Sequence, residues 1–442
     1  MKVLVRVSVL LIAAVAFVAC GDDEPTGAPP PGPPSSVAAV SGSNQTGTVG
    51  EALTNPIQVR VTDSNGRGVP AVEVDFQVAA GGGVITASVA GLNAGSGSSA
   101  KAVVMTDANG EAEATWQLGT VVGQHSATAS VETNDGEVTA SFGAMAQAGP
   151  PVSLSLVSGS GQLAPIGEML ADPLVVRVGD QFDNDVPAAT VDWAVTSGAG
   201  TLSAMSTQTD ASGQASTMLT PSAIGSSEVT STVGTLDPAA FSAIGQAEVS
   251  DPAGDEFSTA ASAGFVPPDI VRMTAWPEAG QLHVEIEFVE DVVSDDVGGP
   301  NVVAGFLDID ADQDPNTGVA SNTDAFRIDG GSTGMGMDFC VIMFMGGTGA
   351  YTVADAAFNS TGTIVPFFNG KVLTMWIPLS MIGGDDGLVD LATVVGTEAE
   401  PTDTAPVSGT LSMSASGGSN TAGAARLARP KFDRRWPPSR KE

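Results

Sequence analysis

One stretch of this sequence occurs twice, and that repeat limits what the chain can fold into more than any other feature. Val-Gly-Glu-Ala-Leu at residues 49–53 returns as Ile-Gly-Glu-Met-Leu at residues 166–170, a spacing of 117 residues. Thr-Asp-Ala-Asn-Gly-Glu-Ala at residues 106–112 returns at residues 209–215 as Thr-Asp-Ala-Ser-Gly-Gln-Ala, a spacing of 103. The repeat predicts two copies of one domain, with about fourteen extra residues in a Gly/Ser-rich loop of the first copy.

Within each copy, apolar and polar residues alternate in short segments that end at Gly, Pro, Asn or Asp. Residues 57–61 (Ile-Gln-Val-Arg-Val) and residues 72–78 are two such segments. A period of two is typical of strands with one buried face, and regular turns are typical of an antiparallel sandwich. Abundant glycine (54) and proline (28) agree with this pattern, so the sequence predicts an all-β chain.

The motifs that recur are Val-Gly-Glu-x-Leu, Pro-x-x-Val-x-Val, a Val-Pro pair and Thr-Asp-x-x-Gly-x-Ala. In these motifs both copies resemble bacterial Ig-like domains of the group found in intimin- and invasin-type adhesins. The resemblance implies tandem Ig-like β-sandwiches, over residues 37–149 and 150–248, that serve as spacers or adhesion modules and carry no catalysis. Trp116 and Trp193 lie in strand-like segments and are predicted to pack in the cores.

The first nineteen residues read as an export signal. Lys2 and Arg6 precede an apolar run that ends at Cys20 and is too short to span a bilayer. The segment Phe-Val-Ala-Cys resembles a bacterial lipobox, which implies a diacylglycerol group on the Cys20 sulfur and cleavage just before it. An ordinary secretory signal with an incidental thiol is the alternative. Residues 20–36 are a Pro/Gly-rich linker, and Gly21 after Cys20 favours the outer membrane or cell surface.

Charge and cysteine content exclude several classes of function. The chain has 50 acidic against 16 basic residues, so nucleic acid is not an expected partner. Only His125 and His283 are available for a zinc site or a Ser-His-Asp triad, so we expect no enzyme. Besides Cys20 the single cysteine is Cys340, which lies in an apolar run and is predicted to be buried.

A different region, predicted over residues 249–415, contains four alternating aspartates. They are Asp308, Asp310, Asp312 and Asp314, directly after an apolar strand. Carboxylates in a tight loop suit a hard cation, so the sequence predicts a Ca²⁺ site there. The loop is not an EF-hand, because Pro315 stands where that motif needs Gly. A solvated acidic turn is the alternative.

Three segments of this region carry a further resemblance. They are Asp-Pro-Ala-Gly-Asp, Leu-Asp-Ile-Asp-Ala-Asp-Gln-Asp-Pro-Asn-Thr-Gly and Ile-Pro-Leu-Ser-Met-Ile-Gly. In them the region resembles family 9 carbohydrate-binding modules and DOMON-like domains. The resemblance implies a jelly-roll-like β-sandwich, structural Ca²⁺ and a sugar-binding face. The aromatic residues that could form such a face are Trp276, Tyr351, Phe367, Phe368 and Trp376, although each also fits the core.

Residues 416–442 carry a cluster of basic residues and are predicted to be a disordered tail. The sequence therefore favours a non-enzymatic, lipid-anchored protein of the cell envelope. In this interpretation an Ig-like stalk presents a module for surface adhesion or polysaccharide binding. Its partners would be the membrane, through the anchor, and a polysaccharide or surface protein. A purely structural envelope protein is one alternative, and a glycan-active hydrolase that uses the abundant carboxylates is the other.

Overall fold

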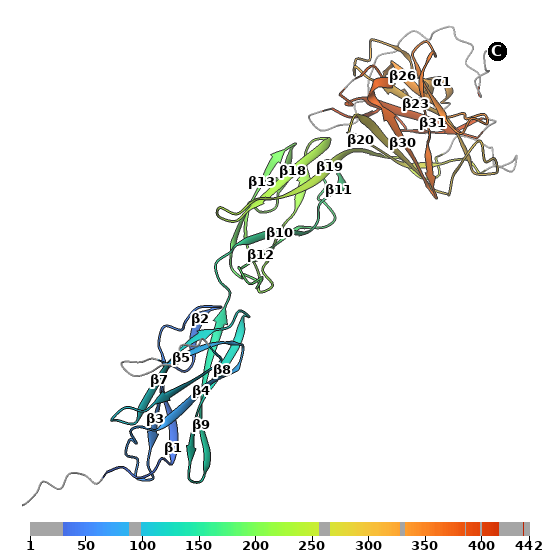
Figure 1. Ribbon diagram of the computed structural model, residues 1–442. Coiled ribbons are helices and arrows are strands. Elements are labelled where there is room, and N and C mark those ends of the chain that lie inside the picture. Colours follow the sequence, from blue (N-terminus) through green and yellow to red (C-terminus); the bar gives the residue numbers. More distant parts are fainter. Residues whose placement is uncertain are drawn as a thin grey trace, which may run out of the picture. The chain divides into compact units, whose positions relative to one another are not determined.

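The computed structural model describes residues 30–87, 99–255, 266–327, 332–384, 386–397, 400–414 and Trp436 (Figure 1). The predicted export signal and Cys20 lie outside these residues. The chain divides into two compact units, Met1–Gln147 and Ala148–Glu442. Strands make up nearly all of the regular structure, so the all-β prediction is confirmed. Among the described residues no helix has the length and apolar character needed to cross a membrane.

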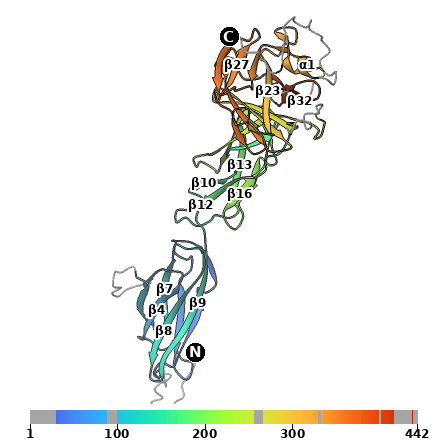
Figure 2. The same ribbon diagram turned by 90° about the vertical axis from the view of Figure 1, so that its right-hand side faces the viewer.

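The first unit is a sandwich of two sheets, coloured blue to cyan in Figure 2. Trp116, Phe76 and Phe142 fill the space between them, and the first two have no exposed surface. One sheet has the order β1 (Ser36–Ser41), β3 (Ile57–Thr62), β7 (Glu111–Leu118) and β5 (Gly83–Ala87). The other has the order β2 (Gln45–Thr48), β9 (Gly136–Gln147), β8 (Gly123–Thr133), β4 (Glu73–Ala80) and β6 (Lys101–Met105).

The second copy repeats this arrangement at the start of the second unit. Trp193 packs against Phe241 in its core, with ring centroids 5.8 Å apart. The first strands of this copy are β10 (Ser153–Ser158), β11 (Gln162–Pro165), β12 (Leu174–Gly179), β13 (Thr190–Ser197) and β14 (Gly200–Leu202). The later ones are β15 (Ser206–Gln208), β16 (Gln214–Thr217), β17 (Leu219–Pro221), β18 (Gly225–Thr232) and β19 (Ala239–Ser250).

Equivalent side chains make equivalent hydrogen bonds in the two copies, at the spacings seen in the sequence. Thr106 Oγ1 donates to the Val69 carbonyl at 2.7 Å, and Thr209 Oγ1 donates to the Val186 carbonyl at 2.6 Å. Each of these threonines also accepts a backbone N–H. Thr106 accepts that of Val72, directly before β4, and Thr209 accepts that of Ala189, directly before β13. The repeat is therefore a duplication of the fold and of its internal polar contacts.

In each copy, one aspartate accepts hydrogen bonds both from its own turn and from the segment that leads into the domain. Asp63 accepts N–H groups from its own turn and from Gly32, at 2.9 Å. Asp180 accepts the N–H of Gly149, 117 residues after Gly32, at 2.8 Å. Gly32, which the prediction assigned to the linker, is thus already bound to the first domain.

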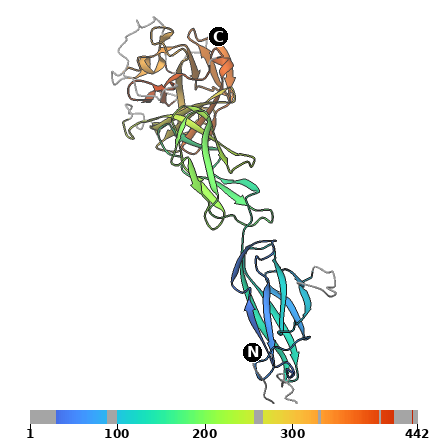
Figure 3. The same ribbon diagram turned by 90° about the vertical axis from the view of Figure 1, so that its left-hand side faces the viewer.

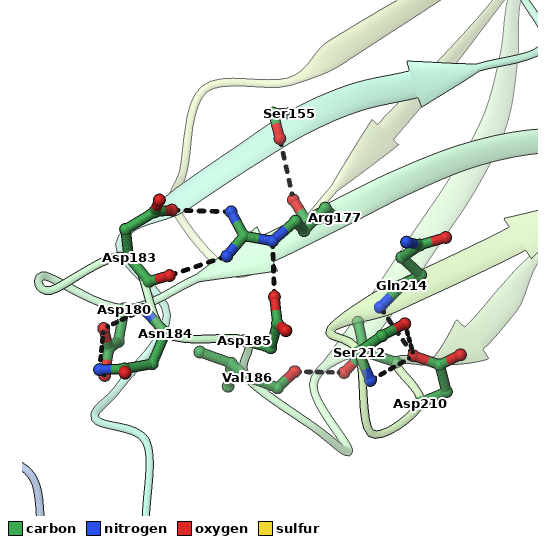
Figure 4. A network of polar contacts seen from close by, with 11 residues as sticks. Ser155, Arg177, Asp180, Asp183, Asn184, Asp185, Val186, Asp210, Ser212 and Gln214 are labelled. Atoms are coloured by element: carbon green, nitrogen blue, oxygen red, sulfur yellow. Dashed lines mark hydrogen bonds and ion pairs between the residues drawn. The ribbon is translucent and has the colours of Figure 1, made fainter. Parts of the chain in front are cut away.

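The ion pairs of this turn differ between the two copies. In the first copy Arg67 pairs with Asp63 itself, at 2.8 Å, whereas in the second copy the arginine is Arg177 and its partners are two other aspartates. Arg177 donates to Asp183 at 2.7 Å and to Asp185 at 2.6 Å (Figure 4). The residues 117 positions earlier are Gly66 and Gly68, which have no carboxylate. The pairs are partly exposed, so their contribution to stability is small.

The last strand of the second Ig-like domain continues into the terminal sandwich. Residues 225–231 of β18 pair with β19 from Ala239 to Gly245, whereas Ala247 to Ser250 of the same strand pair with β20 (Ile270–Glu278). One nine-stranded sheet therefore runs through both domains. The predicted boundary between residues 248 and 249 lies inside this shared strand.

The terminal sandwich has its large apolar core between two sheets, and Figure 3 views it from the side opposite to Figure 2. The sheet that includes β20 continues with β21 (Gln281–Phe288), β30 (Val372–Pro378) and β29 (Phe367–Asn369). The other has the order β28 (Ser360–Ile364), β27 (Tyr351–Asp355), β26 (Phe339–Ile342), β23 (Val302–Asp310), β31 (Asp390–Gly396) and β32 (Pro401–Ala405). Short elements are β22 (Val293–Ser294), β24 (Val319–Ala320), α1 (Asn322–Phe326), β25 (Gly336–Met337), η2 (Leu379–Met381) and β33 (Leu411–Ser412).

The terminal sandwich bears on two predictions, the burial of Cys340 and the disorder of the basic tail. Cys340 on β26 is fully buried. The basic tail of residues 416–442 lies outside the described residues except for Trp436. Its indole packs against the rings of Phe306, Phe326 and Phe344 and donates to the Thr397 carbonyl at 2.9 Å. At least this residue of the tail is therefore attached to the sandwich.

Candidate metal centre and aromatic face

The four predicted metal ligands begin within β23, a central strand of the terminal sandwich with all nine residues buried. Asp308 and Asp310 lie on the strand, and Asp312 and Asp314 follow it. Leu307 and Ile309 point into the large core between the sheets. Because side chains alternate along a strand, Asp308 and Asp310 share the opposite face. The two aspartates nevertheless have different surroundings.

Asp308 holds the start of helix α1. It is fully buried and accepts hydrogen bonds from Asn322 Nδ2 at 2.7 Å, from the Thr323 N–H at 2.7 Å and from Thr323 Oγ1 at 2.8 Å. A carboxylate at the first turn of a helix satisfies donors that have no partner within the helix. Asp308 therefore positions α1, and the structure does not bring it into the group that could bind a metal.

Asp314 is also used locally, in an exposed turn. It accepts the Asn316 N–H at 3.0 Å and Asn316 Nδ2 at 2.8 Å. These hydrogen bonds hold the pKa of Asp314 below its usual value. Its carboxylate stabilises the turn and stands apart from the cluster formed by its neighbours.

Asp310 and Asp312 meet Asp338, a residue that is not among the predicted ligands. One carboxylate oxygen from each lies within 4.8 Å of the other two. Asp338 directly precedes β26, and its backbone N–H donates to the Ile309 carbonyl at 2.9 Å. Antiparallel pairing of β23 with β26 therefore places Asp338 beside Asp310. An isolated acid before an apolar strand was the only signal in the sequence.

The buried member of this cluster lacks a partner for one of its oxygens. Asp310 is 1% exposed, and its Oδ2 accepts only a long hydrogen bond of 3.3 Å from the Gly336 N–H. Its Oδ1 has no hydrogen-bond partner in the part of the chain that the structure describes. A buried carboxylate oxygen without a donor is costly unless a proton or a cation compensates it.

Negative charge accumulates around Asp310. Asp390 lies directly opposite it on β31, and like charges in such cross-strand pairs repel. Burial raises the pKa of Asp310 to about 7, with further contributions from Asp338, Asp390 and Asp312. Burial also raises the pKa of Asp338. A divalent cation would remove this repulsion and occupy the unpaired side of Asp310.

The donor set fits a hard cation. All three groups are carboxylates, the ligands that Ca²⁺ takes in proteins. An open depression lies beside them, lined in part by Asp312, Asp338 and Asp355. Since Asp312 is exposed, water or a ligand hydroxyl can reach the cluster from that side. The residues are therefore suited to hold Ca²⁺ with part of its coordination shell open.

A second feature is a row of rings across the outer face of the other sheet. Trp276, His283 and Trp376 are directly paired on β20, β21 and β30. His283 stacks on Trp276 with centroids 5.1 Å apart and meets Trp376 edge-on at 6.3 Å. Phe367 on β29 extends the row, 6.4 Å from Trp376.

Exposure increases along this aromatic row. Trp276 is 5% exposed, whereas Trp376 is 38% and Phe367 is 53% exposed. Burial lowers the pKa of His283, which favours its neutral form. Two large rings are thus presented to solvent on a rigid sheet. Of the other predicted platforms, Tyr351 is fully buried and Phe368 packs partly against the core.

Comparison with known proteins identifies part of this architecture. Residues 171–243 match the model of the bacterial Ig-like domain (group 1). The matched segment lies within the second copy, whose hydrogen bonds the first copy repeats. The second copy is therefore similar to this domain, and the first copy has the same β-sandwich fold. No curated protein matches the sequence.

Three of the solved structures that match this chain are distant likenesses. FdeC, an Escherichia coli adhesin, is 13% identical, with a TM-score of 0.34 over 84% of this chain and 97% of that chain. Invasin, a bacterial integrin-binding protein, is 12% identical, with a TM-score of 0.25 over 84% and 59%. The D00-D0 domain of intimin is 16% identical, with a TM-score of 0.26 over 47% and 96%. Values of this size carry no argument about function.

Proposed function

We propose that this chain is a non-enzymatic lipoprotein of the bacterial cell envelope. In this proposal its tandem Ig-like domains carry a Ca²⁺-binding sandwich that binds polysaccharide. Cys20 anchors the chain in the outer membrane or at the cell surface. The observation that supports the binding function is the aromatic row that ends in Trp376 and Phe367.

The chemistry of that row suits a sugar polymer. The C–H face of a pyranose ring stacks on an exposed aromatic ring, and stacking on a rigid sheet costs little conformational entropy. In the neighbouring cross-strand row, the partly exposed Glu285 lies between the buried Thr274 and Thr374, and its carboxylate is available to accept hydrogen bonds from hydroxyls. A flat surface with several aligned rings fits an extended chain better than a small enclosed ligand.

Replacing Trp376 by Ala is expected to weaken polysaccharide binding by about tenfold, and the double variant Trp376→Ala, Phe367→Ala by about a hundredfold. The measurement is affinity electrophoresis of the whole chain in gels that contain envelope or plant-type polysaccharides. Phe182→Ala is the matched control, because Phe182 is 39% exposed but lies in the second Ig-like domain.

The outcomes of this experiment separate the candidate functions. Retarded migration that both variants lose supports the proposal, whereas an equal loss in Phe182→Ala contradicts it. Release of reducing ends from a bound polymer would make the protein a hydrolase. Binding to no polymer would favour a purely structural role or a protein partner.

The anchor is tested separately. When the chain is expressed in a bacterium with two membranes, Cys20→Ser is expected to move it from the membrane fraction to the soluble exported fraction. The reason is that several acyl chains on one cysteine provide the binding energy for the bilayer. Incorporation of labelled fatty acid measures the modification directly. An unmodified chain that stays soluble with Cys20 present would contradict the anchor.

A further inference from the structure

Three carboxylates meet where the strand shared by two domains ends. Asp251 directly follows β19, Asp255 lies in the turn after it, and Asp403 lies on β32. One oxygen from each lies within 4.8 Å of the other two. This cluster is separate from the centre at Asp310, and nothing in the proposed polysaccharide binding uses it.

Asp251 points to a ligand independently of the clustering. Asp251 is 6% exposed, and neither of its carboxylate oxygens has a hydrogen bond of good geometry among the described residues. The Val407 backbone N–H is close enough to favour the charged form, but it does not satisfy both oxygens. A buried carboxylate in this state needs a proton or a cation.

Asp403 is held in a fixed orientation next to it. It is 2% exposed, and it accepts the Ile270 N–H on Oδ2 and the Thr404 N–H on Oδ1, both at 2.7 Å. These contacts use one acceptor direction of each oxygen. Because an ionised carboxylate has about four acceptor directions, others remain for a metal ion.

The charges that face the cluster are mostly negative. Asp269 lies close by and accepts the Gly254 N–H at 2.8 Å, which fixes the turn that carries Asp255. Arg327 is the positive group that acts on Asp251. Burial and the neighbouring carboxylates raise the pKa of Asp251 to about 7 and that of Asp403 to about 8. One guanidinium therefore does not compensate these acids.

We propose that Asp251, Asp255 and Asp403 bind a second divalent cation, of the Ca²⁺ class, that ties the end of the shared strand β19 to β32. The three donors are oxygens, which hard cations prefer. The exposed Asp255 leaves room for water ligands to complete the coordination shell. The ion fastens the terminal sandwich to the strand that leaves the second Ig-like domain.

The test counts bound calcium in the whole chain by equilibrium dialysis, in a background without the first centre. With Asp310→Asn, the chain is expected to keep one Ca²⁺ site. Adding Asp255→Asn is expected to weaken that site by at least about tenfold, and adding Asp403→Asn to abolish it. Asp237→Asn, which removes an exposed carboxylate just before β19, is the matched control and should leave the affinity unchanged.

Each result decides the proposal. Asp255 is exposed, so Asp255→Asn tests the site even where Asp403→Asn fails to fold. A chain with Asp310→Asn that binds no calcium would overturn the second site, and so would calcium binding that Asp255→Asn leaves unchanged. Polysaccharide binding that persists when this site is lost would leave the proposed function intact, because the two rest on different residues.

Discussion

In the presence of a chelator, the second unit is expected to lose stability as the pH rises from about 5 to about 8, and saturating Ca²⁺ is expected to prevent that loss. The groups responsible are Asp310 and Asp251, whose pKa is raised to about 7, and Asp403, whose pKa is raised to about 8. Burial is the largest cause in all three.

The sign follows from proton binding. Between the ordinary aspartate pKa of 3.8 and these raised values, the folded chain keeps protons that the unfolded chain has released. Stability is therefore greatest at the acidic end of this window and falls as the pH rises through it. A shift of about three pKa units in one buried group corresponds to at most about 4 kcal/mol. Calcium is expected to bind the ionised carboxylates and so to restore the stability at high pH.

The first unit is an internal control for this experiment. Its shifted carboxylates, Asp63 and Asp107, have a lowered pKa because backbone N–H groups donate to them. The stability that these two groups contribute changes with pH only below the ordinary aspartate pKa of 3.8, which lies outside the pH range of this experiment. Calorimetry or hydrogen exchange should therefore show a pH-dependent second unit beside a first unit that barely changes. Stability of the second unit that rises with pH in chelator, or that ignores Ca²⁺ at the alkaline end, would contradict this account.

Replacing Asp308 by Ala is expected to destabilise the second unit by about 3 to 5 kcal/mol. The substitution removes a fully buried carboxylate and leaves donors of Asn322 and Thr323 without their acceptor. It also leaves a cavity beside β23, which adds to the cost. Denaturant unfolding measures the change. Asp314→Ala is the control, since this exposed aspartate stabilises only its own turn and should cost less than about 1 kcal/mol.

Asp308 and Asp310 should also differ in their effect on metal binding. Asp308→Asn keeps the shape of the side chain and is expected to leave calcium affinity nearly unchanged, because Asp308 is occupied by α1. Asp310→Asn is expected to remove one calcium ion at little cost in folding. Equal loss of calcium in both variants would mean that α1 positions the metal loop.

The repeat and the alternation of apolar residues were sufficient to predict the sandwiches, because both depend on local sequence. The candidate centre was only partly predictable. Asp310 and Asp312 stood out as neighbours in an acidic loop, but Asp338 joins them through the register between β23 and β26, which a single sequence does not reveal. Asp308 looked equivalent to Asp310 until helix α1 supplied its donors.

The shared strand β19 was missed for a different reason. The resemblance to an Ig-like domain ends near residue 248, so the sequence predicts a domain boundary there. Small or apolar residues recur at every second position from Phe241 to Val249, with Ile244 as an exception, and this pattern continues past the end of the repeat. Likewise, Trp436 was assigned to a tail by its basic neighbours, although a large ring among charges can pack against Phe306 and Phe344.

The parallel strand pairs of the two Ig-like domains have a mechanical consequence. In the first domain β2 pairs with β9 over four positions, and in the second β11 pairs with β19 in the same way. Tension along the chain pulls the start of the earlier strand and the end of the later one in opposite directions. The hydrogen bonds between them are then loaded in shear, so they must break together. Since β19 continues into the terminal sandwich, a load on that sandwich reaches this pair directly, without an intervening linker.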